Sequence, residues 1–123
     1  MKVLYLSTGD DRKSDSWLTL NHEYLVLSIL IPSKGPAKLR IIADDNRTPI
    51  LVDATMFEAI SQPLPGTWGA TIRGNGVMEI GPQRWLRFGF WEQYFNADAD
   101  AVSVFEQELQ LMMDAKHHDT NTR

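Results

Sequence analysis

Side chains that could do chemistry are scattered along the chain and do not form a known catalytic motif. His22 stands beside Glu23, and Asp44, Asp53 and Arg73 follow at wide spacing. A histidine next to a carboxylate can act as a general base, but a lone histidine at a strand start is more often a surface hydrogen bonder. No serine lies in the G-x-S-x-G setting of a nucleophile elbow. We therefore predict no catalytic residues, no enzyme activity and no cofactor.

Metal and phosphate sites are not predicted either. The acidic pairs Asp10–Asp11 and Asp44–Asp45, together with Asp53, carry the oxygen ligands that Ca²⁺ and Mg²⁺ prefer. Their spacing matches no EF-hand loop, and aspartates are common in turns because they bond to nearby backbone N–H groups. The glycines of "RGNGV" lack the lysine and the following helix of a phosphate loop, and they fit a β-hairpin.

Large aromatic residues concentrate in one short segment. Half of the twelve aromatic residues lie between Trp85 and Phe95. If residues 89–96 form a helix, the rings occupy two faces, and a domain of this size cannot easily bury both. Such rings either plug the core between sheet and helix or bind another protein, as Trp and Tyr often do at interfaces. We expect Phe90 and Tyr94 to be partly exposed.

The charge of the chain is unevenly distributed. The net charge is −4, with ten basic and nine acidic residues in 1–87 against two basic and seven acidic residues in 88–123. An acidic C-terminal part repels nucleic acid and anionic membranes and attracts basic protein surfaces, although it can also be an ordinary solvated helix face. The candidate partner-binding residues are Phe90, Trp91, Glu92, Tyr94, Asp98, Asp100, Glu106 and Glu108.

The elements that must position these side chains are mainly strands, followed by helix. Runs of β-branched, aromatic and leucine residues alternate with turn formers up to about residue 81. Asn75–Gly76 is the strongest turn signal, because both residues tolerate positive φ. Residues 54–62 fit a short helix or an irregular edge. Strands are expected over residues 2–7, 17–31 (one long strand or a pair), 37–44, 48–54, 67–73 and 77–81.

The last third of the chain has a helical period. Asp98 or Asp100 is the expected N-cap of a helix that runs to Lys116. Its apolar stripe contains Ala101, Phe105, Leu109 and Met112. Strands first and helix last predict an α+β fold, an antiparallel sheet of about five or six strands with a C-terminal helix packed on one face. We expect residues 1–116 to form a single domain and residues 117–123 to form a flexible tail.

Length and composition are those of one small globular domain. The chain has 123 residues, of which 43% are hydrophobic and 23% charged, and it has no cysteine. The apolar runs near the N-terminus and in "YLVLSILI" are too short for a signal peptide or a transmembrane helix. We expect a cytoplasmic protein without disulfides.

The order of the segments over residues 17–112 resembles a known class of proteins. They are "WLTLNHEYLVLSI", "RIIADDNRTPILVDATMFEAIS", "PGTW" and "GPQRWLRFGFWEQYFNADADAVSVFEQEL". This pattern resembles the small single-domain immunity proteins encoded beside bacterial polymorphic and contact-dependent toxins. The resemblance implies a stoichiometric inhibitor of a cognate toxin domain. Many such toxins are nucleases with basic clefts, which an acidic surface would occupy in place of phosphates.

Two other classes of function stay open. The first is a non-catalytic adaptor or structural module, which could be a homodimer formed through the same aromatic patch. The second is a small ligand-binding domain or enzyme, which would need a concave pocket with convergent polar groups. Its residues would be His22, Glu23, Asp44, Asp53 and Arg73.

Overall fold

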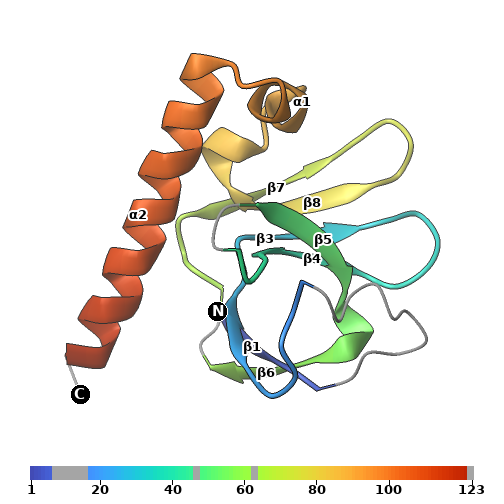
Figure 1. Cartoon of the computed structure of the whole chain (residues 1–123). Coiled ribbons are helices and arrows are strands. Elements are labelled where there is room, and N and C mark those ends of the chain that lie inside the picture. Colours follow the sequence, from blue (N-terminus) through green and yellow to red (C-terminus); the bar gives the residue numbers. More distant parts are fainter. Residues whose placement is uncertain (7–16, 46–47, 62–63, 122–123) are drawn as a thin grey trace.

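Two antiparallel sheets and a long C-terminal helix make up the fold (Figure 1). The computed structural model describes residues 1–6, 17–45, 48–61 and 64–121. In spatial order, the first sheet contains β2 (Glu23–Leu25), β1 (Lys2–Tyr5) and β6 (Phe57–Ser61). The second contains β5 (Pro49–Asp53), β4 (Lys38–Ile42), β3 (Ser28–Ile31), β8 (Met78–Pro82) and β7 (Trp68–Ile72). The predicted α+β class is confirmed, and the strands are divided between two sheets.

Two bends join these sheets into one closed layer. β2 continues into β3 through Val26 and Leu27, and the 3₁₀ turn η2 (Ala54–Met56) links β5 to β6. The Val26 amide donates to the Met1 carbonyl at 2.9 Å, and the Leu27 amide donates to the Arg40 carbonyl at 2.8 Å. At this bend the continuous segment of β2 and β3 therefore stops pairing with β1 and begins to pair with β4. Since β1 also pairs with β6, and β4 with β5, the pairings close around one of the two buried clusters of the described chain.

The interior of this closed layer is filled by alternating side chains. Every second residue of β1 is buried, as expected for a strand with one face toward the core. The ring of Tyr5 lies 5.2 Å from that of Phe57 on the neighbouring strand β6. Burial of each aliphatic side chain contributes about 1.5–3 kcal/mol. The buried residues of this cluster are Val3, Tyr5, Leu18, Tyr24, Val26, Leu39, Ile41 and Val52.

The hairpin of β7 and β8 forms at the predicted turn. The Gly76 amide donates to the Arg73 carbonyl at 3.0 Å, and the Arg73 amide donates to the Val77 carbonyl at 2.8 Å. Gly76 has a φ of 88°, whereas Asn75 does not have a positive φ. Asn75 instead accepts a hydrogen bond from the Val77 amide through its side chain, at 3.1 Å. The turn is thus three residues long, and only its glycine needs the left-handed conformation.

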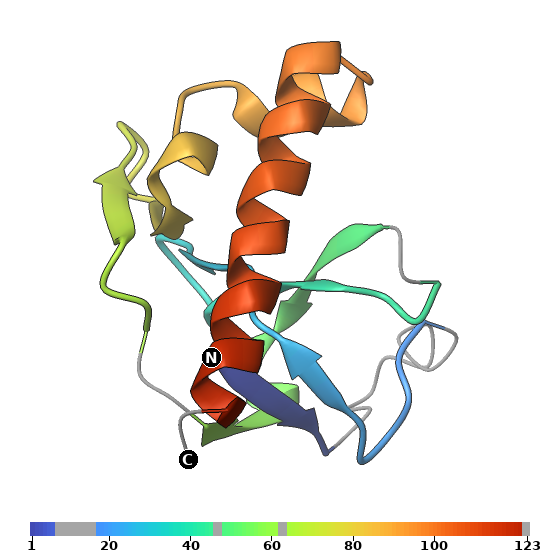
Figure 2. The same cartoon turned by 90° about the vertical axis from the view of Figure 1, so that its left-hand side faces the viewer.

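The helical part covers one side of the sheets (Figure 2). It consists of the 3₁₀ turn η3 (Gln83–Trp85), α1 (Phe90–Phe95) and α2 (Ala99–Asn121). α2 packs on the sheet through Ala101 and Phe105, which share a buried cluster with Leu27, the residue just before β3. Leu109 and Met112 pack at its border, which confirms the predicted apolar stripe. No helix in the described ranges is long and apolar enough to cross a membrane.

Three segments differ from the sequence-based expectation. Residues 17–22 form turns rather than strand, so the predicted strand over 17–31 is the pair β2 and β3. Residues 54–61 combine a 3₁₀ turn with strand β6, because pairing with β1 stabilises an extended backbone there. α2 continues to Asn121, into the segment predicted as a tail.

Candidate protein-binding surface

The backbone conformation of the residues on either side of α1 fixes where this helix begins and ends. Gly89 precedes the helix with a φ of 79°, a conformation that favours glycine. After the helix, Ala97 adopts a φ of 61°, and its amide donates to the Tyr94 carbonyl at 3.0 Å. The Asp98 amide donates to the Gln93 carbonyl at 3.0 Å. This pair of bonds is a Schellman motif, with alanine in the left-handed position that glycine usually occupies.

α2 begins directly after this Schellman motif, without an intervening loop. The carboxylate of Asp98 accepts a hydrogen bond from the Ala101 amide at 3.0 Å, and the Val102 amide donates to the Asp98 carbonyl at 2.9 Å. Asp98 is therefore the N-cap of α2, as one of the two predicted alternatives had it. One short connection thus ends α1 and begins α2, so the two helices are held at a fixed angle.

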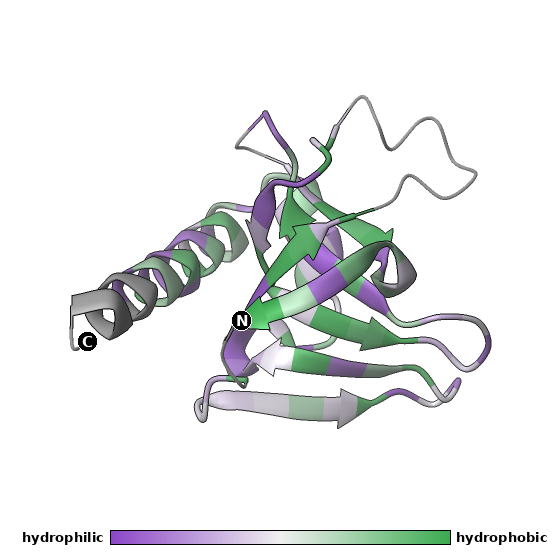
Figure 3. Ribbon diagram, turned by 90° about the horizontal axis from the view of Figure 1, so that it is seen from below, coloured by the Kyte–Doolittle hydropathy of each residue, from purple (hydrophilic) through white to green (hydrophobic). Residues whose placement is uncertain are grey.

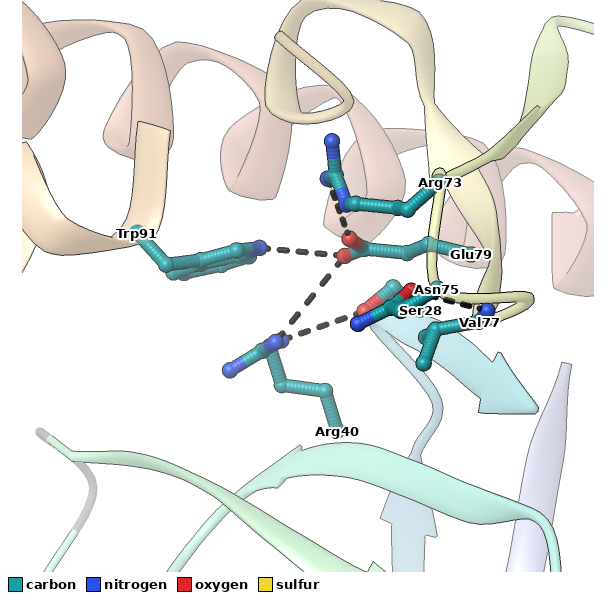
Figure 4. A network of polar contacts seen from close by, with 7 residues as sticks. All are labelled: Ser28, Arg40, Arg73, Asn75, Val77, Glu79 and Trp91. Carbon is teal, nitrogen blue, oxygen red and sulfur yellow. Dashed lines mark hydrogen bonds and ion pairs between the residues drawn. The ribbon is translucent and has the colours of Figure 1, made fainter. Parts of the chain in front are cut away.

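A buried carboxylate anchors α1 to the five-stranded sheet (Figure 4). Glu79 on β8 is 2% exposed, and its Oε2 accepts a hydrogen bond from Trp91 Nε1 at 3.0 Å. Its Oε1 accepts one from Arg73 Nη2 at 3.2 Å. Burying a carboxylate is costly unless charged or polar donors compensate it, and here donors from β8's hairpin and from α1 do so. Glu79 therefore ties the position of Trp91 to the sheet.

Arg40 on β4 completes this network from the other side. Its Nη2 lies 3.9 Å from Glu79 Oε2, its Nε donates to Ser28 Oγ at 3.2 Å, and its guanidinium carbon lies 3.8 Å from the centre of the Trp91 ring. Burial lowers the pKa of Arg40 to about 10, and the charge of Glu79 opposes that shift. Arg40 is thus still a cation at neutral pH, and it stacks on Trp91 as a cation–π pair.

Most of the predicted aromatic surface lies in the core. Phe90 is 1% exposed, and its ring stacks at 6.4 Å on that of Trp85. The prediction that Phe90 is partly exposed is therefore wrong, and Phe90 does not offer a surface to a partner. The reason is that α1 turns Phe90 toward the same cluster as Ala101 and Phe105 of α2. Trp91 is half-buried over this cluster, in edge contact with Trp85 at 5.4 Å.

The exposed rings are partly different from those predicted. Tyr94 is half-buried, which confirms its expected partial exposure, and its ring packs on Phe105 at 4.6 Å. Phe95 is 54% exposed and lies 5.2 Å from Tyr94, whereas Phe88 before α1 is 83% exposed. Sequence reasoning did not select these two. The glycine after Phe88 and the four-residue spacing from Trp91 to Phe95 were the available signals.

Acidic side chains surround these rings on both helices. Residues 88–114 contain six acidic residues and no lysine or arginine. Glu92 on α1 and Asp100 and Glu106 on α2 are exposed, and no ion pair within the described part of the chain neutralises them. Burial, and then the charge of Glu106, raise the pKa of Tyr94. Tyr94 and Glu106 are thus close enough to contribute an aromatic ring and a negative charge to the same contact.

Two of the predicted acidic residues already have structural partners. Glu108 is mostly buried, and its Oε2 lies 3.2 Å from Nη1 of Arg84 on η3. Asp98 is exposed, but its carboxylate caps α2.

Beside the Arg84–Glu108 pair lies a shallow open groove of about 550 Å³. Its lining residues are Arg84, Ser103, Glu106, Gln107, Gln110 and Leu111.

The residues considered for an enzyme site do not come together. Glu23 pairs with Lys2 at 3.2 Å, and Asp53 pairs with Lys38. Asp44 accepts hydrogen bonds from the hydroxyl of Tyr24 at 2.5 Å and from Oγ1 of Thr19 at 2.6 Å. His22 is exposed and Arg73 binds Glu79. Glu23, Asp44, Asp53 and Arg73 thus each have a local partner in the fold, whereas His22 is exposed.

No group of three or more histidine or acidic side chains in the described ranges could hold a metal ion. Asp10 and Asp11 lie outside the described residues. No known protein family, no curated protein and no solved structure matches this chain.

Proposed function

We propose that the protein is a non-catalytic binding protein whose acidic, aromatic helical end engages a basic surface on another protein. The resemblance noted in the sequence makes the specific form of this proposal an immunity protein that neutralises a cognate toxin domain in the cytoplasm. A nuclease with a basic substrate cleft is the toxin class that fits the charge. The contact surface contains Tyr94, Phe95, Glu92, Asp100 and Glu106.

One observation carries this proposal: the partly exposed ring of Tyr94, the exposed ring of Phe95 and unpaired carboxylates stand on a rigid support. Tyr94 and Phe95 project from α1, which Glu79, Arg40 and the caps hold in place. A surface held in its bound conformation loses little conformational entropy when it binds. Large exposed rings then contribute most of the contact area, as aromatic hot spots do.

The unpaired carboxylates provide the electrostatic attraction to the basic surface of the partner. Glu92, Asp100 and Glu106 would attract a basic surface over several ångströms and so raise the association rate. The rings would be desolvated after contact and so slow the dissociation. An inhibitor of this kind acts by occupying the partner's surface, and it requires no bond-making residue.

The experiment is an affinity purification of the tagged full chain from its own host, followed by mass spectrometry. A near-stoichiometric partner that carries a toxin domain is the expected result. The double variant Glu92→Lys/Glu106→Lys should then weaken binding at least about 100-fold, since each reversal replaces attraction with repulsion in a close charge pair. We choose these residues because both are exposed, whereas reversal of Glu108 would break its ion pair with Arg84.

Glu58→Lys is the matched control. Glu58 is an exposed glutamate on β6, outside the helical end. Reversal of Glu58 changes the net charge by as much as either of the two other reversals does. It should nevertheless leave the affinity within about threefold of the wild type. If Glu58→Lys weakens binding as much per reversed charge as the double variant does, general charge rather than this surface is responsible. A purification that returns no partner, or a partner without a toxin domain, removes the immunity hypothesis.

A further inference from the structure

The five-stranded sheet has two edge strands, β7 and β5, and the outer edge of β7 differs from that of β5. β7 pairs with β8 on one side, and no strand in the described ranges pairs with its other side. Figures 2 and 3 both place β7 as the outermost strand of the sheet. Its sequence, Trp68-Gly-Ala-Thr-Ile72, contains no proline and no charged residue. Natural proteins usually protect edge strands with such residues.

The opposite edge strand, β5, carries that protection. β5 begins at Pro49, which lacks a backbone donor, and ends at Asp53, which forms an ion pair with Lys38. β7 instead ends at Ile72, whose side chain is 68% exposed. The two edges of one sheet thus differ in their chemistry, and only β7 is suited to accept another strand.

The register of the hairpin shows which backbone groups β7 offers. The Arg73 amide bonds to the Val77 carbonyl, so Thr71 and Gly69 bond to β8 at the alternate positions further along the ladder. Ala70 and Ile72 then direct their N–H and C=O groups away from β8. The backbone groups of Trp68 also point away from β8, but its amide already donates to the Pro65 carbonyl at 3.1 Å.

We propose that β7 pairs with β7 of a second copy of this chain, which gives a twofold dimer with a continuous sheet. Two identical antiparallel strands overlap fully when Ala70 lies opposite Ala70 of the second copy. In this register each Ile72 lies opposite the other copy's Trp68. Aromatic and β-branched residues form favourable cross-strand pairs, and the twofold axis repeats this pair. Self-complementarity therefore favours a second copy over an unrelated strand.

Charge and size also fit this arrangement. The antiparallel register places the two Arg73 side chains at opposite ends of the interface, so they do not repel one another. The centre contains only Gly69, Ala70 and Thr71, whose small side chains permit close approach of the two backbones. The β7 edge lies outside the helical surface proposed above, so the dimer and the binding function can be tested separately.

The test measures the mass of the full-length protein against concentration by analytical ultracentrifugation. The wild-type chain should show a reversible monomer–dimer equilibrium. Ala70→Lys and Ala70→Glu should each raise the dimer dissociation constant about tenfold or more, because like charges would lie directly opposite each other. An equal mixture of the two variants should restore dimers, since each pair then joins opposite charges. Ala70 is exposed, so both variants should keep the circular dichroism spectrum of the wild type.

Leu51→Lys is the control, because Leu51 is an exposed residue on the protected edge strand β5. It should leave the dissociation constant unchanged. A wild-type chain that stays monomeric up to its solubility limit would overturn the dimer. Dimers that neither Ala70 variant weakens would place the interface elsewhere. Failure of the mixture to recover dimers would refute the register centred on Ala70.

Discussion

The guanidinium carbon of Arg40 lies 3.8 Å from the centre of the Trp91 ring, so β4, an inner strand of the five-stranded sheet, is in direct contact with α1. Both residues also face the carboxylate of Glu79 on β8. Strand β4 thus meets two elements from much later in the chain, β8 and α1, at one buried charge. The orientation of α1, and of the exposed rings at its end, depends on this contact.

Replacement of Glu79 should release α1 and lower the stability of the whole fold. Glu79→Gln leaves Arg40 buried without its counter-ion, which typically costs about 3–5 kcal/mol. Urea denaturation measures the free energy of unfolding. The control is Glu58→Gln at an exposed site on β6, where a change within about 0.5 kcal/mol is expected. Similar small effects of both variants would contradict a structural role for the Glu79 network.

The two phenylalanines on either side of Gly89 should differ strongly in how much stability their truncation costs. Phe90→Ala removes a fully buried ring and should cost about 3–5 kcal/mol. Phe88→Ala removes a ring that is 83% exposed and should change stability by less than about 0.5 kcal/mol. Thermal and urea denaturation of the two variants in parallel provide the measurement. Equal losses would mean that Phe88 packs against the protein.

The left-handed residue after α1 offers a stabilising substitution. Ala97 has a φ of 61°, which costs alanine about 1–2 kcal/mol relative to the right-handed region. Ala97→Gly relieves this strain and should raise the free energy of unfolding by about 0.5–1 kcal/mol, after the added freedom of the unfolded chain is subtracted. Ala99→Gly, two residues later at the start of α2, should lower stability instead. A loss in both variants would show that Ala97 is not strained.

Alkaline pH should weaken the closed layer through Tyr24. Burial, and then the hydrogen bond to Asp44, raise the pKa of Tyr24 above its ordinary value of 10.0. The unfolded chain therefore loses this proton first, so stability that is present below about pH 10 falls as the pH rises toward the folded pKa. Tyr24→Phe should lower stability near neutral pH by about 1–2 kcal/mol and make the alkaline loss shallower. Urea denaturation near pH 8 and near pH 11 tests both effects; an unchanged alkaline slope would exclude Tyr24 as the titrating group.

Local signals in the sequence predicted much of the secondary structure. Asn75–Gly76 marked the β7–β8 turn, Asp98 capped α2, and the spacing from Ala101 to Met112 identified its buried face. These features depend on residues within a few positions of one another, so propensity and periodicity are sufficient to find them. The α+β class follows from the same signals, because strands precede the helix.

The candidate surface was predicted only in part. Its acidic character and its place on α1 and α2 follow from composition, since residues 88–114 have acidic residues and no basic ones. Which ring of a dense aromatic run faces outward depends on the angle at which α1 meets the sheet. That angle placed Phe90 inside and left Phe88 and Phe95 outside. The binding function, the toxin partner and the dimer remain predictions for the experiments above.

The sequence by itself determined where strands, turns and helices form, and it concentrated aromatic and acidic residues in one segment. Only the tertiary structure decided that β1 pairs with β6, that the two bends close the sheets around one of the two buried clusters, and that Glu79 joins Arg40 to Trp91. The physical reason is distance along the chain. Strand pairing and the desolvation of a buried charge depend on partners that lie far apart in sequence and meet only when the whole chain has folded.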